Sequence, residues 1–189
     1  MASSSPERHD RGTMARTAVG FSVHTGWAAM VAVGGVRKPE VLARQRVALV
    51  AGNRFVYHAA MDIELAAAAR QIAAAAKEAE RSAFQAIDLV RAEHAVGRCA
   101  IVASPSSPPD ELAAIVRAHP LIHTAEGALY RDAILAAASR HRLQVELFPP
   151  KTLSADAAEL AEAGRGIGPP WGKDQKLAAL AAWRMLRAG

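Results

Sequence analysis

The sequence predicts an α/β protein with a mixed five-stranded sheet, in which three antiparallel strands are followed by parallel strands and helices flank the sheet. Two observations predict this class. Early in the chain, three apolar runs of strand-like composition are separated only by short turns, which favours an antiparallel meander. Later, helix-like and strand-like segments alternate, which favours parallel strands joined by helical crossovers.

The first three strands are predicted from apolar runs and from the turns between them. The runs span Thr17–His24, residues 27–33 and residues 41–50. The dipeptide TG after His24 supplies a tight turn, and the dipeptide GG with the segment RKPE separates the second run from the third. Such short connections join neighbouring antiparallel strands.

Helices and strands alternate through the rest of the chain. The longest expected helix spans residues 62–93, is rich in alanine and carries a partial apolar stripe. Ser107 or Asp110 is expected to cap the short helix that follows the next strand. The remaining elements are expected as a buried strand at 98–103, a helix at 123–141, a strand at 143–148, a helix at 155–163 and a last helix at 174–186.

At 189 residues, the chain has the length of one ordinary domain. We therefore expect one domain at residues 16–189, preceded at residues 1–15 by a disordered leader rich in Ser, Pro, Gly and Arg. Hydrophobic residues make up 51% of the chain, aromatic residues only 5%, and much of the apolar content is alanine. This composition predicts a helix-rich, closely packed core.

Net charge and cysteine content limit the classes of function. The formal net charge of +5 and the pI of about 9.9 favour an anionic partner such as nucleic acid, although a solvated basic surface explains them equally well. The single Cys99 excludes a disulfide framework within one chain. Without a signal-like segment or an apolar stretch long enough for a bilayer, the sequence predicts a cytoplasmic protein with no membrane partner.

Two segments resemble a known family when they are combined with this element order. They are GFS followed by TGWAAMV near the start, and GKDQKLAALAAW near the end. Together they resemble the ribonuclease H-like superfamily, and within it the RuvC-type Holliday-junction resolvases, from Thr17 onward. The resemblance implies a ribonuclease H-like fold and a metal-dependent nuclease. The segments SVHTGWAA and HTAEG are also similar to uncharacterised bacterial proteins, which implies no function.

The acidic site of that family is degenerate in this sequence. The family's first strand carries Gly, an apolar residue and Asp, whereas GFS ends in Ser22. The family places two acids three apart on its last helix; Asp174 matches the first and Leu177 stands at the second. The family's glutamate after the fourth strand has no counterpart in residues 101–104. Because these nucleases use clustered carboxylates to hold two divalent ions about 4 Å apart, the site is either rebuilt with other ligands or has lost catalysis.

Five polar residues are the candidates for a rebuilt site: Ser22, His24, His123, Glu126 and Asp174. If the first strand is central and the last helix packs beside it, His24 and Asp174 approach each other. His123 and Glu126 share a helix face because they are three residues apart. We expect Glu126, Asp174 and His123 to bind a divalent Mg, Mn or Zn ion, and a histidine to ligate the ion or to act as the general base.

Simpler structural explanations stay open for the same residues. Ser22 and His24 are equally well explained as a hydrogen-bonded pair that ends a strand. Glu126 is expected in the first turn of its helix, where the helix dipole favours a carboxylate. Asp174 is a first-turn or N-cap residue in this interpretation. The role of His58, between the third strand and the long helix, stays open.

Three functions are compatible with these residues. The first hypothesis is a metal-dependent phosphodiesterase or nuclease-like protein with a modified ribonuclease H-like site. The alternative is a non-catalytic ribonuclease H-like module that binds nucleic acid or a protein partner, with Arg140 and Arg142 in contact with phosphates. The third is a homo-oligomer that assembles through its alanine-rich helices. If no phosphate is bound, residues 131–132 and 140–142 are expected to be solvated surface.

Overall fold

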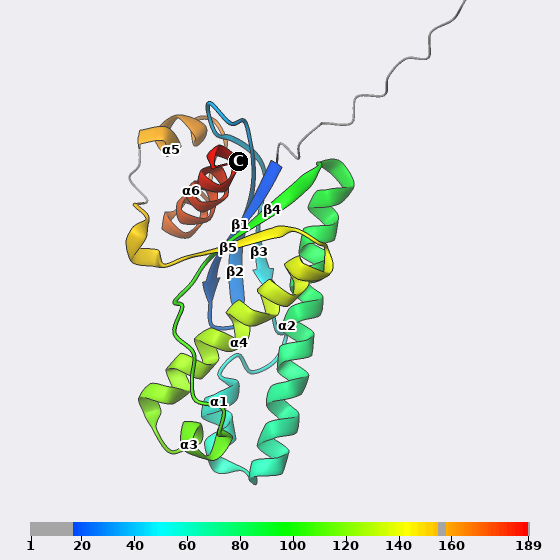
Figure 1. Cartoon of the computed structure of the whole chain (residues 1–189), viewed down its shortest axis with the longest axis vertical. Coiled ribbons are helices and arrows are strands. Elements are labelled where there is room, and N and C mark those ends of the chain that lie inside the picture. The colour runs from blue at the N-terminus through cyan, green and yellow to red at the C-terminus, as the bar shows by residue number, and fades with distance from the viewer. Residues whose placement is uncertain (1–16, 155–157, 189) are drawn as a thin grey trace, which may run out of the picture.

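The structure is a computed structural model that describes residues 17–154 and 158–188, and its centre is a five-stranded sheet (Figure 1). The strands are β1 (Thr17–His24), β2 (Trp27–Gly34), β3 (Glu40–Ala48), β4 (Val96–Val102) and β5 (Gln144–Phe148). In the sheet order β3-β2-β1-β4-β5, the first three strands are antiparallel, and β4 and β5 run parallel to β1. The predicted mixed sheet is confirmed, and β1 is its central strand.

Helical elements connect and cover these strands. They are α1 (Val56–Ala59), η1 (Ala60–Asp62), α2 (Leu65–Glu93), α3 (Leu112–Val116), α4 (His119–Arg140), η2 (Pro150–Thr152), α5 (Ala158–Ala163) and α6 (Lys173–Arg187). The sequence pattern does not predict α1 and η1. The expected leader at residues 1–15 and the first residues of the helix expected at 155–163 lie outside the described residues. Among the helices that are described, none is both long and apolar enough to cross a membrane.

Two predictions at helix starts are wrong. α4 begins at His119 rather than at residue 123, because Pro120 is well accommodated in a first helical turn, where its missing N–H removes no helical hydrogen bond. α3 is preceded by Glu111 and has no hydrogen bond from a capping side chain. Neither Ser107 nor Asp110 therefore caps it. The start of α4 matters for the site, because it adds a histidine to the helix.

The helices form a layer on each side of the sheet. α2 and α4 cover one face, and α6 lies against the other (Figure 1). Along β1, Val19 and Phe21 belong to the core under α2 and α4, whereas Ala18 belongs to the core under α6. Since side chains alternate along a strand, Ser22 and His24 lie on the α6 side.

Gly20 allows α6 to approach β1 closely. A Cβ atom at Gly20 would lie 2.0 Å from the backbone oxygen of Ala178, a distance at which the two atoms would overlap. His24 lies four residues after Gly20 in β1 and contacts Asp174, which lies four residues before Ala178 in α6. β1 and α6 therefore run in opposite directions, and the N-terminus of α6 lies where β1 ends.

Different candidate residues lie at the two ends of the parallel strands. Since β1, β4 and β5 are parallel, their carboxyl ends share one edge, and His24, the start of α6 and His123 of α4 lie near it. Arg140 and Arg142 come directly before β5, so they lie at the opposite edge.

Candidate functional site

Three of the five candidate residues come together where β1 ends. His24 Nε2 lies 2.9 Å from Asp174 Oδ1, and the Ser22 hydroxyl donates a long hydrogen bond of 3.5 Å to the same oxygen. The His24 nitrogen is close to the carboxylate but is not aligned with it as a hydrogen bond, so the contact is electrostatic. We call Ser22, His24 and Asp174 the β1–α6 cluster. The approach of His24 to Asp174 that central β1 implies is present in the structure.

Aromatic and cationic groups extend the β1–α6 cluster across the sheet. The His24 ring stacks on Trp27, its partner in the β-hairpin, with ring centroids 4.2 Å apart and planes inclined by 5°. The Arg46 guanidinium of β3 lies 3.6 Å from the centroid of the Trp27 ring. Sequence reasoning missed Trp27 and Arg46, although the hairpin register places Trp27 opposite His24. The row formed by His24, Trp27 and Arg46 fixes the orientation of the His24 ring.

The β1–α6 cluster does not have the geometry of a serine hydrolase triad. In such a triad the histidine lies between the serine and the carboxylate, so that it can take the hydroxyl proton. Here Asp174 lies between Ser22 and His24, because both groups contact its Oδ1 atom. Ser22 therefore has no adjacent histidine that would take its proton as in such a triad.

The residues present also do not fit a two-ion nuclease centre. Asp174 supplies a carboxylate, but the side chains that contact it are those of Ser22 and His24, and Leu177 is buried in an apolar cluster with Ala181. At the end of β4, Ala103 and Ser104 offer no carboxylate. A site that binds two divalent ions needs several carboxylates, and one does not suffice.

A second cluster lies on the other side of β1, between α1 and α4. His58 Nδ1 lies 3.0 Å from Glu126 Oε1, and the backbone N–H of His58 donates to the same oxygen at 3.4 Å. The Glu126 side chain is only 2% exposed. Because α4 begins at His119, Glu126 is about two turns into the helix, and the prediction that the helix dipole stabilises it in a first turn is wrong.

Three histidines converge beside Glu126. His119 and His123 are one turn apart on the same side of α4, and His58 of α1 faces them. One ring nitrogen of each lies within 4.8 Å of those of the other two. We call His58, His119 and His123 the histidine cluster. Sequence reasoning missed His119, although the spacing of four residues to His123 would have signalled it once the helix start was correct.

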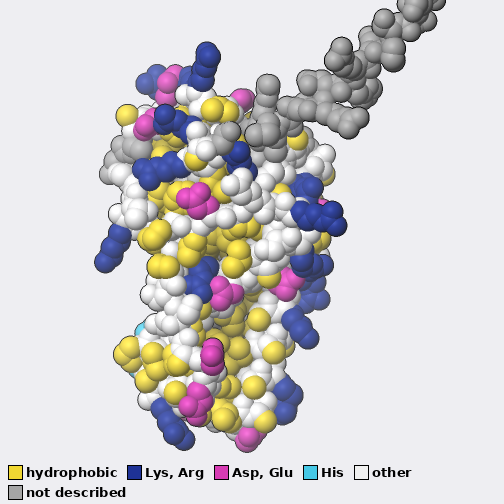
Figure 2. All heavy atoms as spheres, viewed as in Figure 1, with side chains coloured by type: hydrophobic (Ala, Val, Ile, Leu, Met, Phe, Trp, Pro, Cys, Tyr) yellow, Lys and Arg dark blue, Asp and Glu magenta, His cyan; other side chains and the backbone are white. Residues whose placement is uncertain are grey.

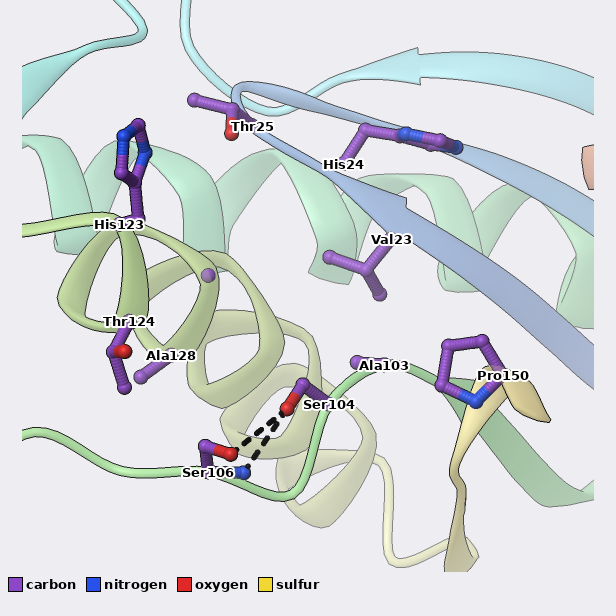
Figure 3. A pocket seen from close by; sticks show the side chains of 11 residues that line it. Val23, His24, Thr25, Ala103, Ser104, Ser106, His123, Thr124, Ala128 and Pro150 are labelled. Carbon is purple, nitrogen blue, oxygen red and sulfur yellow. Dashed lines mark hydrogen bonds between the residues drawn. The ribbon is translucent and has the colours of Figure 1, made fainter. Parts of the chain in front are cut away.

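A cavity of about 460 Å³ lies between the two clusters (Figure 3). His24 and Thr25 line it from the end of β1, and His123 lines it from α4. Figure 3 shows Val23 and His24 projecting from opposite sides of β1, with Val23 pointing toward α4. The cavity thus connects the surroundings of the two clusters, but the clusters themselves are separate.

The structure does not assemble the predicted metal ligands Glu126, Asp174 and His123 as one set. Asp174 belongs to the β1–α6 cluster, whereas Glu126 contacts His58. Within residues 17–154 and 158–188, the set of three or more potential ligands with converging atoms is the histidine cluster. The two carboxylates were expected together because a sequence does not show on which side of the sheet each residue points.

Two buried polar residues of α4 stabilise the surroundings of the cavity. The Tyr130 hydroxyl donates to the backbone oxygen of Arg54 at 2.6 Å, and burial, together with the negative charge of Glu126, raises the pKa of Tyr130 to about 12. Arg131 donates to the backbone oxygens of Ser104 and Ser106 at 2.9 and 2.7 Å, which fixes the loop at the cavity rim. The expectation that Arg131 is solvated is wrong, because this side chain is buried against the loop.

The predicted phosphate-contacting arginines are remote from the cavity. Arg140 pairs with Glu80 of α2, and Arg142 lies at the opposite edge of the sheet. His141 between them is buried, and its Nδ1 atom lies 3.0 Å from Arg91 Nη1. His141 is therefore not solvated surface. On the face in Figure 2, Lys and Arg side chains are scattered rather than gathered in one patch.

No protein-family model and no curated protein matches the sequence. Two solved structures of RuvC from Thermus thermophilus are similar to it in fold. RuvC in complex with a Holliday junction substrate matches with a TM-score of 0.53 and 18% sequence identity, over 91% of this chain and 94% of that chain. A second RuvC structure gives a TM-score of 0.49 and 17% identity, over 91% and 95% of the two chains. The first of these similarities, together with the sheet topology, shows that this chain has a RuvC-like, ribonuclease H-like fold.

Proposed function

We propose that this chain binds nucleic acid at the sheet edge where β1 ends, and that it does so without a two-ion nuclease centre. The observation that supports the proposal most directly is the composition of the β1–α6 cluster, in which Asp174 is the single carboxylate and contacts His24. The RuvC structure of similar fold was solved with a Holliday junction. A protein with this fold but with a single carboxylate in the β1–α6 cluster is suited to binding nucleic acid rather than to cleaving it with two metal ions.

The charges around the β1–α6 cluster favour a phosphate backbone. Arg46 and Lys173 have exposed side chains, and Lys176 is partly exposed. The N-terminus of α6, where Lys173 and Asp174 lie, adds the positive end of a helix dipole. A protonated His24, with Nε2 2.9 Å from Asp174 Oδ1, would offset the negative charge with which Asp174 opposes a phosphate.

The test compares the two edges of the sheet. We expect the Arg46→Ala/Lys173→Ala variant to bind a labelled four-way junction, duplex or single strand less tightly than the unmodified protein, in fluorescence anisotropy titrations at several salt concentrations. Each lost phosphate contact should lower the slope of log K against log salt by about 0.9, so two contacts lower it by about 2. The matched control is Arg140→Ala/Arg142→Ala, which removes the same charge from the opposite edge.

The control separates this proposal from binding through the predicted arginine patch. If the Arg140→Ala/Arg142→Ala variant loses as much affinity as the other variant, binding is not localised where β1 ends. Absence of binding to all three nucleic acids at low salt would contradict the proposal outright.

A second candidate function is metal-dependent hydrolysis of a phosphodiester, favoured by the cavity that His24 and His123 line from two sides. A bound Mg, Mn or Zn ion would supply Lewis-acid chemistry there, and the His24–Asp174 pair would supply a general base. Hydrolysis of bis(4-nitrophenyl) phosphate and of junction DNA is measured with each metal. We expect His24→Ala to lower the hydrolysis rate by about 10²-fold or more. A rate for the unmodified protein equal to that of buffer with metal excludes this function.

A further inference from the structure

We propose that His58, His119 and His123 bind one divalent transition-metal ion of the zinc class, with Glu126 as the carboxylate that orients His58. This site differs from the metal set that the sequence predicts, and it does not depend on nucleic-acid binding. It also lies apart from the β1–α6 cluster, whose carboxylate Asp174 contacts His24 and none of these three histidines.

The three imidazoles are placed closely enough to share one ion. One nitrogen of each lies within 4.8 Å of the others, and the rings stand edge to face, with centroids 4.4 Å to 5.3 Å apart. In tetrahedral zinc sites, Zn–N bonds of about 2.0–2.1 Å put ligand nitrogens about 3.3 Å apart. His119 and His123 are exposed, so rotation of their side chains can close this difference without displacing core residues.

Glu126 gives the strongest support for an ion at this position. Its carboxylate is 2% exposed, and a buried carboxylate is unfavourable unless a positive group compensates it. Among the described residues, the Glu126 carboxylate contacts the ring and the backbone N–H of His58 and forms no ion pair with Lys or Arg. A divalent ion bound to His58 would supply the missing positive charge.

The contact between Glu126 and His58 also selects the tautomer that binds a metal. When the Nδ1–H group of His58 donates a hydrogen bond to Glu126 Oε1 at 3.0 Å, Nε2 carries the free lone pair. Carboxylates that hold histidine ligands in this way are a regular feature of zinc sites, and their loss typically weakens metal binding by about 10- to 100-fold. Glu126 is thus a positioning residue in the proposed site.

The donor set determines the class of ion. Imidazole nitrogens suit Zn²⁺, Co²⁺, Ni²⁺ and Cu²⁺, whereas Mg²⁺ prefers oxygen ligands. Three protein ligands leave a fourth tetrahedral position for water or another ligand. Because His123 also lines the 460 Å³ cavity, a ligand in that cavity has access to the neighbourhood of the ion.

The test measures metal binding by the full chain with no nucleic acid present. After removal of metal by chelation and dialysis, calorimetric titration with Zn²⁺ and elemental analysis should give one tightly bound ion per chain. We expect His119→Ala to lower the affinity at least about tenfold, and Glu126→Gln to lower it by about 10- to 100-fold. The matched control is His24→Ala, which removes a histidine that lines the same cavity but belongs to the β1–α6 cluster.

The same measurements can overturn the proposal. Absence of a stoichiometric Zn²⁺ site, equal loss in His24→Ala and His119→Ala, or Mg²⁺ affinity equal to that for Zn²⁺ each contradicts it. Circular dichroism shows whether each variant is folded. His119 and His123 are both exposed, so His123→Ala provides a second test if one variant does not fold. Failure of nucleic-acid binding leaves the result of this titration unchanged, so the two proposals can fail separately.

Discussion

The β1–α6 cluster and the histidine cluster both pair a histidine with a carboxylate, but the two carboxylates have different environments. Asp174 is 31% exposed, lies in the first turn of a helix and is contacted by both Ser22 and His24. Glu126 is 2% exposed and relies on His58. The first environment keeps a charge stable with water and a helix dipole, so it needs no further partner. The second makes the charge dependent on a cation, which is why the metal proposal applies there.

The two carboxylates, Asp174 and Glu126, are also held in place by different packing contacts. A close approach of α6 to β1 at Gly20 positions Asp174, whereas the packing of α4 on α1 and α2 positions Glu126. The two clusters should therefore respond to different substitutions. The following predictions separate them, in order of decreasing effect.

The largest effect is expected from Gly20→Ala. The added Cβ atom would overlap the backbone oxygen of Ala178 at 2.0 Å, so α6 must move away from β1. We expect a loss of about 3 kcal/mol in the free energy of unfolding, the upper end for overpacking, measured by urea denaturation. Because α6 carries Asp174 but no member of the histidine cluster, Zn²⁺ binding of the folded variant should be unchanged.

Gly127→Ala is the matched control for that substitution. Gly127 lies within α4 next to Glu126, and a Cβ atom there would meet nothing within 4 Å. Replacing an exposed helical glycine with alanine should stabilise the protein by about 0.5–1 kcal/mol. Similar destabilisation by both substitutions would show that the approach of α6 to β1 is not the cause.

The next effect concerns Tyr130, beside the histidine cluster. Its pKa is raised from 10.0 to about 12, first by burial and then by Glu126. Below pH 10 the phenol is protonated in both folded and unfolded chains, and from pH 10 to about 12 only the unfolded chain ionises. The contribution of Tyr130 to stability should therefore fall by about 2 kcal/mol over this range.

Tyr130→Phe isolates this contribution from the other groups that ionise at high pH. At pH 7 the variant should be about 1 kcal/mol less stable, because the backbone oxygen of Arg54 loses a hydrogen bond. The deficit should shrink, and then reverse, as the pH approaches 12. Unfolding free energies of the two proteins that stay parallel from pH 8 to pH 12 would contradict a raised pKa at Tyr130.

The same contrast explains what could be predicted from the sequence. The sheet follows from local patterns, because apolar runs and tight turns define β1 to β3. The contact of His24 with Asp174 is expected from the resemblance to the ribonuclease H-like family, which implies a central first strand with the last helix beside it. The pairing of His58 with Glu126 joins residues 68 positions apart through α1, a helix of four residues. So short a helix has no recognisable periodicity, and its position depends on packing against α4.

The smallest effect is expected within the row that extends the β1–α6 cluster. Arg46 lies 3.6 Å from the centroid of the Trp27 ring and is exposed, so the cation–π contact should contribute about 0.5–1 kcal/mol. A double-mutant cycle with Arg46→Ala and Trp27→Leu, measured by urea denaturation, should give a coupling energy of this size. A coupling energy near zero would mean that the contact of Arg46 with Trp27 does not stabilise the fold. Since the histidine cluster has no contact with this row among the described residues, none of these variants should change Zn²⁺ binding.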